Sequence, residues 1–431
     1  MQVVGYICGG ARVTSEEQLA TLQFPTIATM KRQLALPPAH RRASAFWSLL
    51  AVLGVLLGLL FLLSPARAET WVVGPDGQPN DLAAAVAKAQ DGDVIDVLPG
   101  VYKGVHLVLE GRRLTLRGSG EKPPVFDGEG TMGPYPALVL VRGGDVVLEN
   151  LEFRGARSEQ SAGAGVRLEG GRLTLRNCHF RDNEHGVSTN NDAQAELLIE
   201  ASSFGMAPRV EGGLYHLLNV GRIARLTVTG SRFQQGFEGH LVRSRARETT
   251  LRHNMIHDGP GGGASYEIDL PNGGLVTLVG NVIGQGRNSQ NPVMVAYGAE
   301  GMSWDRNRLV LAHNTFLNYG WIPAWFLRVF DERLPADTEV IAVNNLTVGM
   351  GLFSLINGGL FEGNGIATFG MLRDAETYGF ELPPSSYWRG KGVDPRSVGG
   401  LDMSPQAEFR WPVGTEKLPK LGRWSPGAYQ R

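Results

Sequence analysis

The stretch 254–283, NMIHDGPGGGASYEIDLPNGGLVTLVGNVI, contains one full period of the pattern that decides the fold. It begins at Asn254 and Ile256 and returns, after turns rich in Gly, Pro, Asn and Asp, to Asn281 and Ile283. Between these points, short runs in which apolar and polar residues alternate are typical of β-strands. The stretch therefore predicts a unit of several short strands that ends where the next unit begins.

The same unit recurs along most of the chain. A polar turn residue, usually Asn, is followed two or three positions later by Phe, Ile or Val, and these apolar residues are 23 to 33 positions apart. A β-sandwich would show turns every 8–12 residues without this longer period. The period instead predicts a solenoid whose parallel coils stack about 4.8 Å apart, with Asn side chains in register. The repeated pairs are Asn150 with Phe153, Asn177 with Phe180, Ser202 with Phe204, Ser231 with Phe233, Asn254 with Ile256, Asn281 with Ile283, Asn314 with Phe316, and Asn345 with Val348.

Two further segments resemble a known superfamily. The segment DLAAAVAKAQDGDVIDVLPGVYKG (81–104) is similar to the N-terminal cap and first coil of the pectate-lyase-like superfamily, and Ser425–Gln430 (SPGAYQ) resembles its last strand. Asp81–Ala89 reads as a short helix that Asp81 caps. The resemblance covers about residues 70–431. It implies an all-β fold, a right-handed single-stranded parallel β-helix (solenoid), with a short N-terminal capping helix and an irregular C-terminal cap.

The organisation expected from these patterns has four parts. Residues 1–68 form a leader, 69–93 an N-terminal cap, 94–365 the β-helix, and 366–431 a C-terminal cap that lies along the solenoid and covers a sheet edge. Aliphatic residues at matching slots should be buried in the core. These residues are Val94, Leu148, Leu175, Val228 and Leu278.

The leader has the pattern of an export signal. Trp47–Leu63 is almost wholly aliphatic or aromatic, basic residues precede it, and Ala66-Arg67-Ala68 is a small-x-small cleavage signal. Met30 fits as the true start, because residues 1–29 do not resemble the basic beginning of a signal. Cleavage would leave Glu69 as the first residue, whereas an uncleaved run of roughly 20 apolar residues would anchor the protein in a membrane. Both outcomes place the body of the protein outside the cytoplasm, in the periplasm or the extracellular space.

Composition narrows the range of partners. The 431 residues carry a net charge of −1, so the chain lacks the basic surplus expected of a nucleic-acid-binding protein. Cys8 and Cys178 do not suggest a disulfide framework. We expect no nucleic acid partner, a membrane contact only through the leader, and Cys178 as a buried thiol.

The main polar cluster falls in residues 238–274. Alternation along the two strand patterns places Arg243 and Arg245 outward on one, and Glu267 and Asp269 outward on the other. The offsets between the arginines and the carboxylates are 22 to 26 residues, which matches the coil period. We therefore expect two arginines beside two carboxylates on adjacent coils.

Three interpretations of this cluster stay open. The four residues could form a surface ion-pair ladder, which would stabilise by only ~0–1 kcal/mol per pair. Glu267 and Asp269, about 6.6 Å apart along the strand, lie between the carboxyl separations of retaining and inverting glycosidases, roughly 5 and 6.5–9.5 Å. With Glu238 they could instead hold Ca²⁺, which takes six to eight oxygen ligands, beside an arginine that serves a uronate lyase.

The stretch also resembles the active-site coils of the chondroitinase-B and alginate-lyase family. That family pairs acidic calcium ligands with a lysine on one coil and an arginine on the next. Glu238 matches an acidic ligand and Arg245 the lysine position, whereas the arginine position falls on or next to Glu267. The resemblance implies calcium-assisted cleavage of a uronate polysaccharide, with both catalytic positions changed.

Aromatic and histidine side chains give further candidates for substrate binding. His240 lies on the arginine-rich coil and could act as an acid or base, or be an inward, hydrogen-bonded histidine. Trp321 and Trp325 could stack on sugar rings or pack beneath the long excursion 320–339. His253 and His257 are four apart in a strand–turn context rather than on a helix, so they do not share a face as zinc ligands would, and Gly259–Gly263 is read as a turn because it lacks the Lys-Ser/Thr of a phosphate loop.

Together these observations favour an exported β-helix protein that binds or cleaves a polysaccharide, which could contain uronate, on an outward face near residues 238–274. The alternative is a non-catalytic periplasmic or envelope solenoid, adhesin-like or accessory, in which the ladder is structural. A tryptophan, Trp321 or Trp325, overhanging the coil of Glu267 would form a groove and favour the first interpretation.

Overall fold

The computed structural model describes residues 47, 50, 51, 54, 68–130, 136–396 and 398–431. The chain divides into two units, Met1–Pro65 and Ala66–Arg431. The four described residues of the first unit are helical, and the rest of the expected leader up to residue 67 lies outside the described residues. Within the described part, no helix has both the length and the apolar character needed to cross a membrane.

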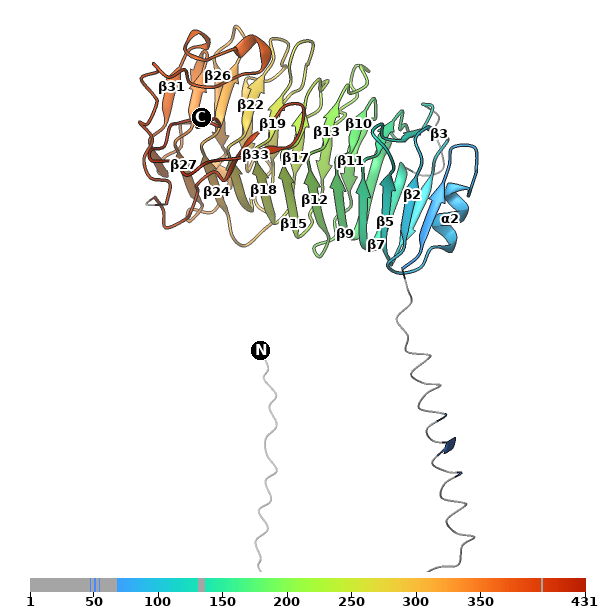
Figure 1. The fold of residues 1–431 in the computed structure, drawn as a ribbon. Coiled ribbons are helices and arrows are strands. Elements are labelled where there is room, and N and C mark those ends of the chain that lie inside the picture. Colours follow the sequence, from blue (N-terminus) through green and yellow to red (C-terminus); the bar gives the residue numbers. More distant parts are fainter. Residues whose placement is uncertain (1–46, 48–49, 52–53, 55–67, 131–135, 397) are drawn as a thin grey trace, which may run out of the picture. The chain divides into compact units, whose positions relative to one another are not determined.

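The second unit is a parallel β-helix, which confirms the predicted fold class. Its strands form one 20-stranded and one 11-stranded sheet, and every strand pairing within these two sheets is parallel. Each strand pairs with the strand one coil later, as Val242 pairs with Ile268. Figure 1 shows the coils side by side, from the N-terminal helix α2 to β31 at the opposite end.

Each full coil passes through three faces, and the long strands β7 and β9 run through the first two. The first face contains β4 (Leu107–Glu110), β7 (Ala137–Glu149), β9 (Ala164–Arg176), β11 (His185–Thr189), β14 (Leu218–Val220), β17 (Val242–Ser244), β20 (Ile268–Leu270), β23 (Val293–Tyr297), β26 (Ala324–Val329) and β29 (Gly351–Leu352). The second face adds β1 (Thr70–Val73), β2 (Val94–Val97), β5 (Arg113–Gly118), β12 (Glu196–Glu200), β15 (Arg225–Thr229), β18 (Glu248–Arg252), β21 (Leu275–Val279), β24 (Arg308–Ala312), β27 (Glu339–Val343) and β30 (Leu360–Glu362). The third face contains β3 (Val101–Lys103), β6 (Val125–Asp127), β8 (Glu152–Arg154), β10 (His179–Arg181), β13 (Ser203–Gly205), β16 (Arg232–Phe233), β19 (Met255–His257), β22 (Val282–Gln285), β25 (Thr315–Asn318), β28 (Leu346–Val348) and β31 (Gly365–Ala367).

The remaining elements are short. They are the helix α2 (Leu82–Lys88), the 3₁₀ turns η2 (Asp331–Arg333), η3 (Phe369–Met371) and η4 (Ala375–Thr377), and the antiparallel pair β32 (Ala407–Phe409) and β33 (Thr415–Lys417). As predicted, Asp81 caps the helix, because its side chain accepts the N–H of Ala84.

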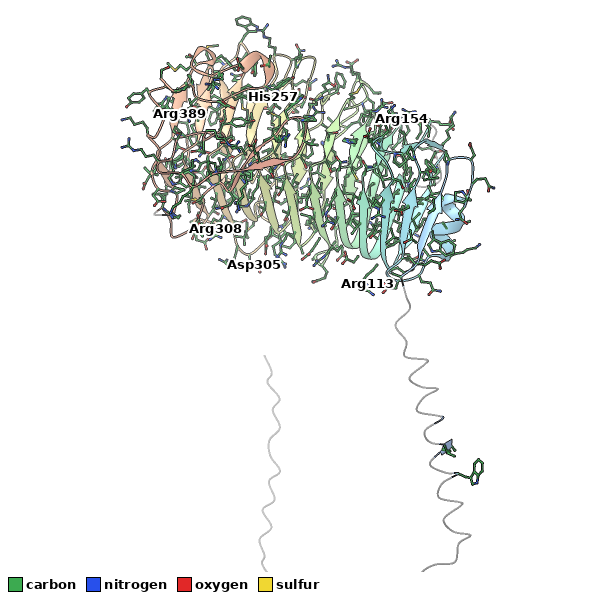
Figure 2. All side chains as sticks on the ribbon, in the orientation of Figure 1. Arg113, Arg154, His257, Asp305, Arg308 and Arg389 are labelled. Carbon is green, nitrogen blue, oxygen red and sulfur yellow. The ribbon has the colours of Figure 1, made fainter. Side chains whose placement is uncertain are left out.

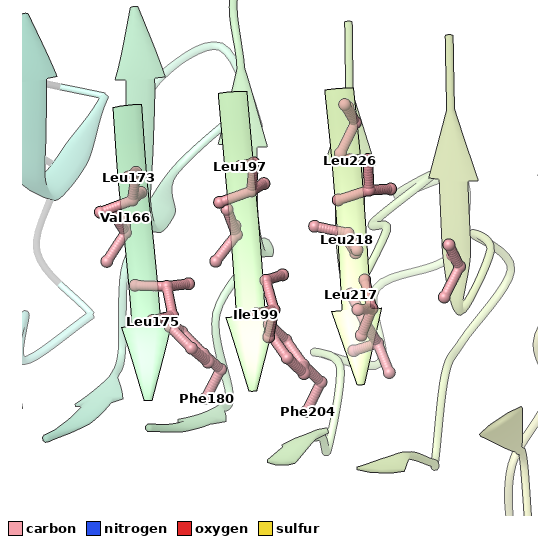
Figure 3. Close-up of a cluster of buried hydrophobic side chains, with 14 of the residues drawn as sticks. Val166, Leu173, Leu175, Phe180, Leu197, Ile199, Phe204, Leu217, Leu218 and Leu226 are labelled. Carbon is pink, nitrogen blue, oxygen red and sulfur yellow. The ribbon is translucent and has the colours of Figure 1, made fainter. Parts of the chain in front are cut away.

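The core is built from identical slots on successive coils (Figure 3). The rings of Phe180 and Phe204 stack with centroids 4.6 Å apart, and those of Phe204 and Phe233 with centroids 4.5 Å apart. Four of the five predicted core residues are fully buried, namely Leu148, Leu175, Val228 and Leu278. The prediction for Val94 was wrong. Ile95 and Val97 point inward on that strand, so Val94 has the opposite parity and is only half-buried.

A second set of slots holds an asparagine ladder inside one corner. The Nδ2 of Asn254 donates to Oδ1 of Asn281 (2.9 Å), and the same bond joins each later pair through Asn314 and Asn345 to Asn364. This confirms the predicted amide stacking. Asn150 and Asn177 lie one position earlier in their coils than the ladder residues do in theirs. They occupy the corner itself, where the backbone has positive φ.

The C-terminal segment folds back along the solenoid. The N–H of Gly414 donates to the carbonyl of Gly230, and that of Ala428 to Oγ1 of Thr315. Ser425–Gln430, which resembles a last strand in sequence, forms no strand; its backbone groups bond to side chains of earlier coils and to Gln430 instead.

Candidate functional site

A depression with a polar lining on the first face is here called the outer groove. It has a volume of about 450 Å³ and crosses the coils of β11, β14, β17, β20 and β23. Five coils at 4.8 Å per step give it a span of about 20 Å. Its lining is almost wholly polar or glycine: Thr189, Asn191, Asn219, Gly221, Arg222, Arg243, Arg245, Asn272, Glu300 and Ser303.

Arg243, Arg245 and Glu300 line the groove, and the buried carboxylate of Asp269, outside the lining, pairs with Arg243. Register places Arg243 directly beside Asp269, and their side chains meet at 3.1 Å (Nε to Oδ2). Glu300, on the excursion after β23, accepts from Nη2 of Arg243 at 2.8 Å and from both Nη atoms of Arg245 at 2.7 and 2.9 Å. Arg245 also donates to Oδ1 of Asn272. The predicted contact of an arginine with an outward carboxylate on the next coil is thus present between Arg243 and Asp269, whereas Arg245 pairs with Glu300, two coils later.

The two carboxylates have opposite electrostatic environments. Burial raises the pKa of Asp269 to about 6, although Arg243 and Arg245 oppose this shift. The hydrogen bonds from Arg245 lower the pKa of Glu300, which is about half exposed. Near neutral pH, Asp269 therefore takes up a proton readily, whereas Glu300 remains ionised. Arg243 contacts both carboxyl groups.

A row of aromatic rings, outside the groove lining, runs along the start of these strands. His185, His216, His240 and Tyr266 follow one another on successive coils, with centroids 5.7, 4.6 and 4.9 Å apart. The N–H of His240 donates to Nδ1 of His216 (3.0 Å), so the proton of the His216 imidazole is on Nε2. Nε2 of His240 is 3.5 Å from Oδ2 of Asp269. Burial lowers the pKa of His240 to about 3, so the ring is neutral at physiological pH.

The expectation that Glu267 faces outward was wrong. Glu267 is fully buried, and neither of its carboxylate oxygens has a hydrogen-bond partner within the described residues. The strand begins only at Ile268, and Glu267 stands at the corner before it, beside Leu241 on the preceding coil, which also points inward. Burial and the nearby Asp258 raise the pKa of Glu267 well above its usual value. Alternation cannot be counted through a corner, because the chain turns there.

Glu238, Trp321 and Trp325 also stand apart from the groove lining. The carboxylate of Glu238 accepts the N–H of Gly212 (2.7 Å), and no three His, Cys, Asp or Glu side chains of the described part are arranged to hold a metal ion. The residues therefore do not fit the calcium site considered for Glu238. Trp325 lies on β26 beneath the Arg328 guanidinium, and the exposed Trp321 contacts Arg287. Neither tryptophan belongs to the lining of the groove.

Sequence reasoning missed Glu300 and the histidine row. Glu300 lies between strand patterns, and nothing in its local sequence ties it to Arg245, 55 positions earlier. The histidines did leave a signal. His185, His216 and His240 are separated by 31 and 24 residues, which is the coil period.

Comparisons with solved structures agree with this architecture. Pectate lyase Pel9A has a TM-score of 0.60 and 14% identity, covering 85% of this chain and 98% of its own. An alginate lyase from Paenibacillus sp. str. FPU-7 has a TM-score of 0.50 and 17% identity, covering 69% of this chain and 99% of its own. The chain shares the parallel β-helix fold of these proteins, and at this identity the likeness concerns the fold alone. No family model matches the chain. No curated protein matches it either.

Proposed function

We propose that this protein binds an extended, carboxylate-bearing polysaccharide along the outer groove. The proposal rests on one observation. Arg243 and Arg245 both form ion pairs with a single, half-exposed carboxylate, that of Glu300. A guanidinium presents a planar fork of donors that fits a carboxylate, so a uronate group can replace Glu300 in the same geometry. The exposed side of the groove makes this exchange accessible from solvent.

The other groups of the groove suit a sugar chain. Asn219, Asn272 and Thr189 line the groove and can exchange hydrogen bonds with hydroxyls. Outside the lining, the partly exposed ring of Tyr266, at the end of the aromatic row, gives an apolar surface of the kind that packs on sugar rings. The groove crosses five coils, so it suits a polymer better than a single small molecule. The fold shared with proteins named as pectate lyase and alginate lyase is consistent with this ligand class.

Cleavage of the bound chain is a second candidate function, and a specific observation favours it. General acid catalysis by a carboxyl requires a raised pKa, and its partner carboxylate must stay ionised. Asp269 and Glu300 differ in this way and both contact Arg243. In this scheme Asp269 protonates the glycosidic oxygen as its bond to the anomeric carbon breaks. Glu300 either takes a proton from the water that attacks this carbon, or attacks it to form an ester that water then hydrolyses.

We also propose export to the periplasm or beyond, on the apolar run and cleavage signal in residues 43–68. N-terminal sequencing of the protein recovered from the producing cells tests this. Glu69 as the first residue supports cleavage, and recovery of Trp47–Leu63 on the mature chain supports an anchor instead. A first residue at or before Met30 in cytoplasmic protein would contradict export.

The proposed function is tested with a panel of uronate and neutral polysaccharides. Binding is measured by affinity electrophoresis, and cleavage by two signals, the ultraviolet absorbance of unsaturated uronate and the release of reducing ends. Unsaturated product indicates a lyase, reducing ends alone indicate a hydrolase, and binding without either indicates a non-catalytic receptor. Absence of binding to every uronate polymer contradicts the proposal.

A further inference from the structure

A second cavity lies away from the outer groove, where the turns after the third face meet the C-terminal segment. Its volume is about 420 Å³, within the range of small-molecule sites. In Figure 2, His257, which lines it, lies toward the upper edge of the solenoid, whereas Asp305, on the excursion that carries Glu300, lies toward the lower edge. The lining is His257, Gly259, Pro260, Gly261, Gly286, Arg287, Asn288, Tyr319, Ala375 and Tyr378.

His257 is a buried polar group without a partner in this cavity. Only 5% of the residue is exposed, and neither ring nitrogen has a hydrogen-bond partner within the described residues. Its ring is enclosed by Tyr319, Tyr378 and Phe380, with centroids 5.3, 5.5 and 5.9 Å away. Buried polar groups in native proteins are nearly always satisfied, so an unpaired imidazole beside a cavity points to a ligand that completes it.

Open space lies next to the imidazole because glycines form the wall. A Cβ added to Gly259 would be 3.3 Å from the hydroxyl of Tyr378 and 3.9 Å from Nδ1 of His257, so both polar atoms border the space that this glycine leaves open. The turn is held in shape by Asp258, whose carboxylate accepts the N–H groups of Gly236 (2.8 Å) and Ala264 (3.0 Å). The glycine-rich turn 259–263 is thus a rigid wall of the cavity.

The other side of the cavity provides a positive charge. Arg287 is exposed, lines the cavity and lies over the ring of Trp321, with its guanidinium carbon 5.6 Å from the centroid. No carboxylate ion pair to Arg287 is present among the described residues. The walls between this charge and His257 are formed by Pro260, Ala375 and the tyrosine rings.

We infer that this cavity binds a small ring compound that carries a carboxylate and at least one hydroxyl group. The carboxylate pairs with Arg287, a hydroxyl bonds to the imidazole of His257 or the phenol of Tyr378, and the ring packs against Tyr319 and Pro260. A neutral imidazole both donates and accepts a hydrogen bond, which matches a hydroxyl. Burial lowers the pKa of His257 to about 4, so the ring keeps this neutral form at physiological pH. A sugar acid and a hydroxylated aromatic acid share this chemistry.

The test uses calorimetric titration of the full chain with four probes. Glucuronic acid and 4-hydroxybenzoate carry the carboxylate, and glucose and phenol are their neutral counterparts. We expect saturable binding of at least one acid, at least about tenfold tighter than that of its neutral counterpart. Which acid binds distinguishes a sugar ligand from an aromatic one. No saturable binding of either acid, or equal binding of acid and neutral probe, overturns the inference.

Three variants locate the binding. Arg287→Gln changes an exposed side chain, so it should leave folding unchanged. It should weaken the binding of the acid at least about tenfold. Arg328→Gln is the matched control, because Arg328 lies over Trp325 at 5.0 Å but outside the cavity, and it should have no effect.

His257→Phe should weaken the binding of the acid and of its neutral counterpart alike. If that variant does not fold, Arg287→Gln alone decides, and unchanged binding there overturns the inference. Arg245→Gln in the outer groove leaves this binding unchanged, so failure here is distinguishable from failure of the proposed function.

Discussion

Arg245 and Glu300, 55 residues apart in the sequence, form a two-bonded ion pair across the first face, with Nη1–Oε2 and Nη2–Oε1 distances of 2.7 and 2.9 Å. The same carboxylate also holds Arg243. Glu300 is about half exposed, so solvent screens the pair and its contribution to stability is small. Its larger effect is to keep both guanidinium groups in one orientation, in the position that a ligand carboxylate would take.

Replacing Glu300 by Gln should strengthen the binding of uronate polymers. The variant removes the carboxylate that competes for the two arginines, and we expect an affinity gain of about threefold to tenfold for acidic but not neutral polymers. Any cleavage that uses Glu300 is lost in the same variant. Glu196→Gln is the control, since Glu196 also binds two arginines, Arg172 and Arg225, but on the second face. Weaker binding of acidic polymers to the Glu300 variant would contradict the exchange of carboxylates.

Binding of acidic polymers should weaken as the pH rises through about 6. The pKa of Asp269 is raised from 3.8 to about 6, so the groove gains a negative charge above that pH. An added unit charge about 4 Å from the ligand charge, with the screening of bulk water, changes the binding free energy by about 1 kcal/mol, or roughly fivefold in affinity. Affinity measured at about pH 5 and about pH 7.5 should show this change in the parent and not in Asp269→Asn. The same pH dependence in both proteins would exclude Asp269 as its source.

Glu267 should make the protein less stable as the pH rises above about 4.5. Its pKa in the folded state is raised, so folding holds a proton that the unfolded chain releases above its ordinary pKa. The stability that the protonated Glu267 contributes is fully present below the pKa of the unfolded state. Between the unfolded-state and folded-state pKa values, it falls by about 1.4 kcal/mol per pH unit. Glu267→Met should therefore melt higher than the parent, by an amount that grows from about pH 5 to pH 7.

The variant Glu267→Gln separates charge from polarity in that measurement. It should flatten the pH dependence in the same way, yet melt below Glu267→Met, because its amide is still buried without partners. Asp258, whose pKa burial raises to about 6, and the buried histidines, such as His240 and His257, whose pKa values burial lowers, add opposite slopes that all three proteins share, so the test compares differences between the proteins. A stability difference between Glu267→Met and the parent that does not grow with pH across this window would show that Glu267 is ionised in the fold.

The asparagine ladder should contribute strongly to stability. Asn281 donates to the carbonyl of Leu251 and to Asn314, and accepts from Asn254, all in the buried interior. Asn281→Ala leaves these groups unpaired, and we expect a loss of about 2–4 kcal/mol in the free energy of unfolding by denaturant titration. Asn364→Ala, at the partly buried end of the ladder, should cost less. Equal and small losses for both variants would mean that the ladder only fills space.

Most of the fold could be read from the sequence because each coil must repeat the same slots. The side-chain amides of Asn254 and Asn281 are joined by a hydrogen bond, which requires an Asn at the same place in both coils. The 27-residue step between them is therefore visible as a repeat. Val94 shows the limit of this reading. The repeat predicts the coil in which a residue lies. Whether its side chain points inward or outward depends on where the strand begins, and in this strand Ile95 rather than Val94 points inward.

The site could be predicted only in part, for a similar physical reason. Arg243 and Asp269 lie on paired strands, where register and parity apply, and they meet as predicted. Glu267 stands at a corner, and Glu300 on an excursion, where neither rule holds. The buried position of Glu267 and the reach of Glu300 back to Arg245 depend on the path of the turns, which composition and period do not determine.

The central claim is that the arginines of the outer groove hold an acidic polysaccharide. It is tested most directly by the affinity of one uronate polymer for the parent, Arg245→Gln and Arg225→Gln. Arg225 is the matched control, with carboxylate partners Glu196 and Glu248 at 3.3 and 3.1 Å on the second face. We expect a loss of about tenfold to a hundredfold for Arg245→Gln, with unchanged melting, and no loss for Arg225→Gln. Equal affinity for all three proteins, or equal losses in both variants, would contradict the account.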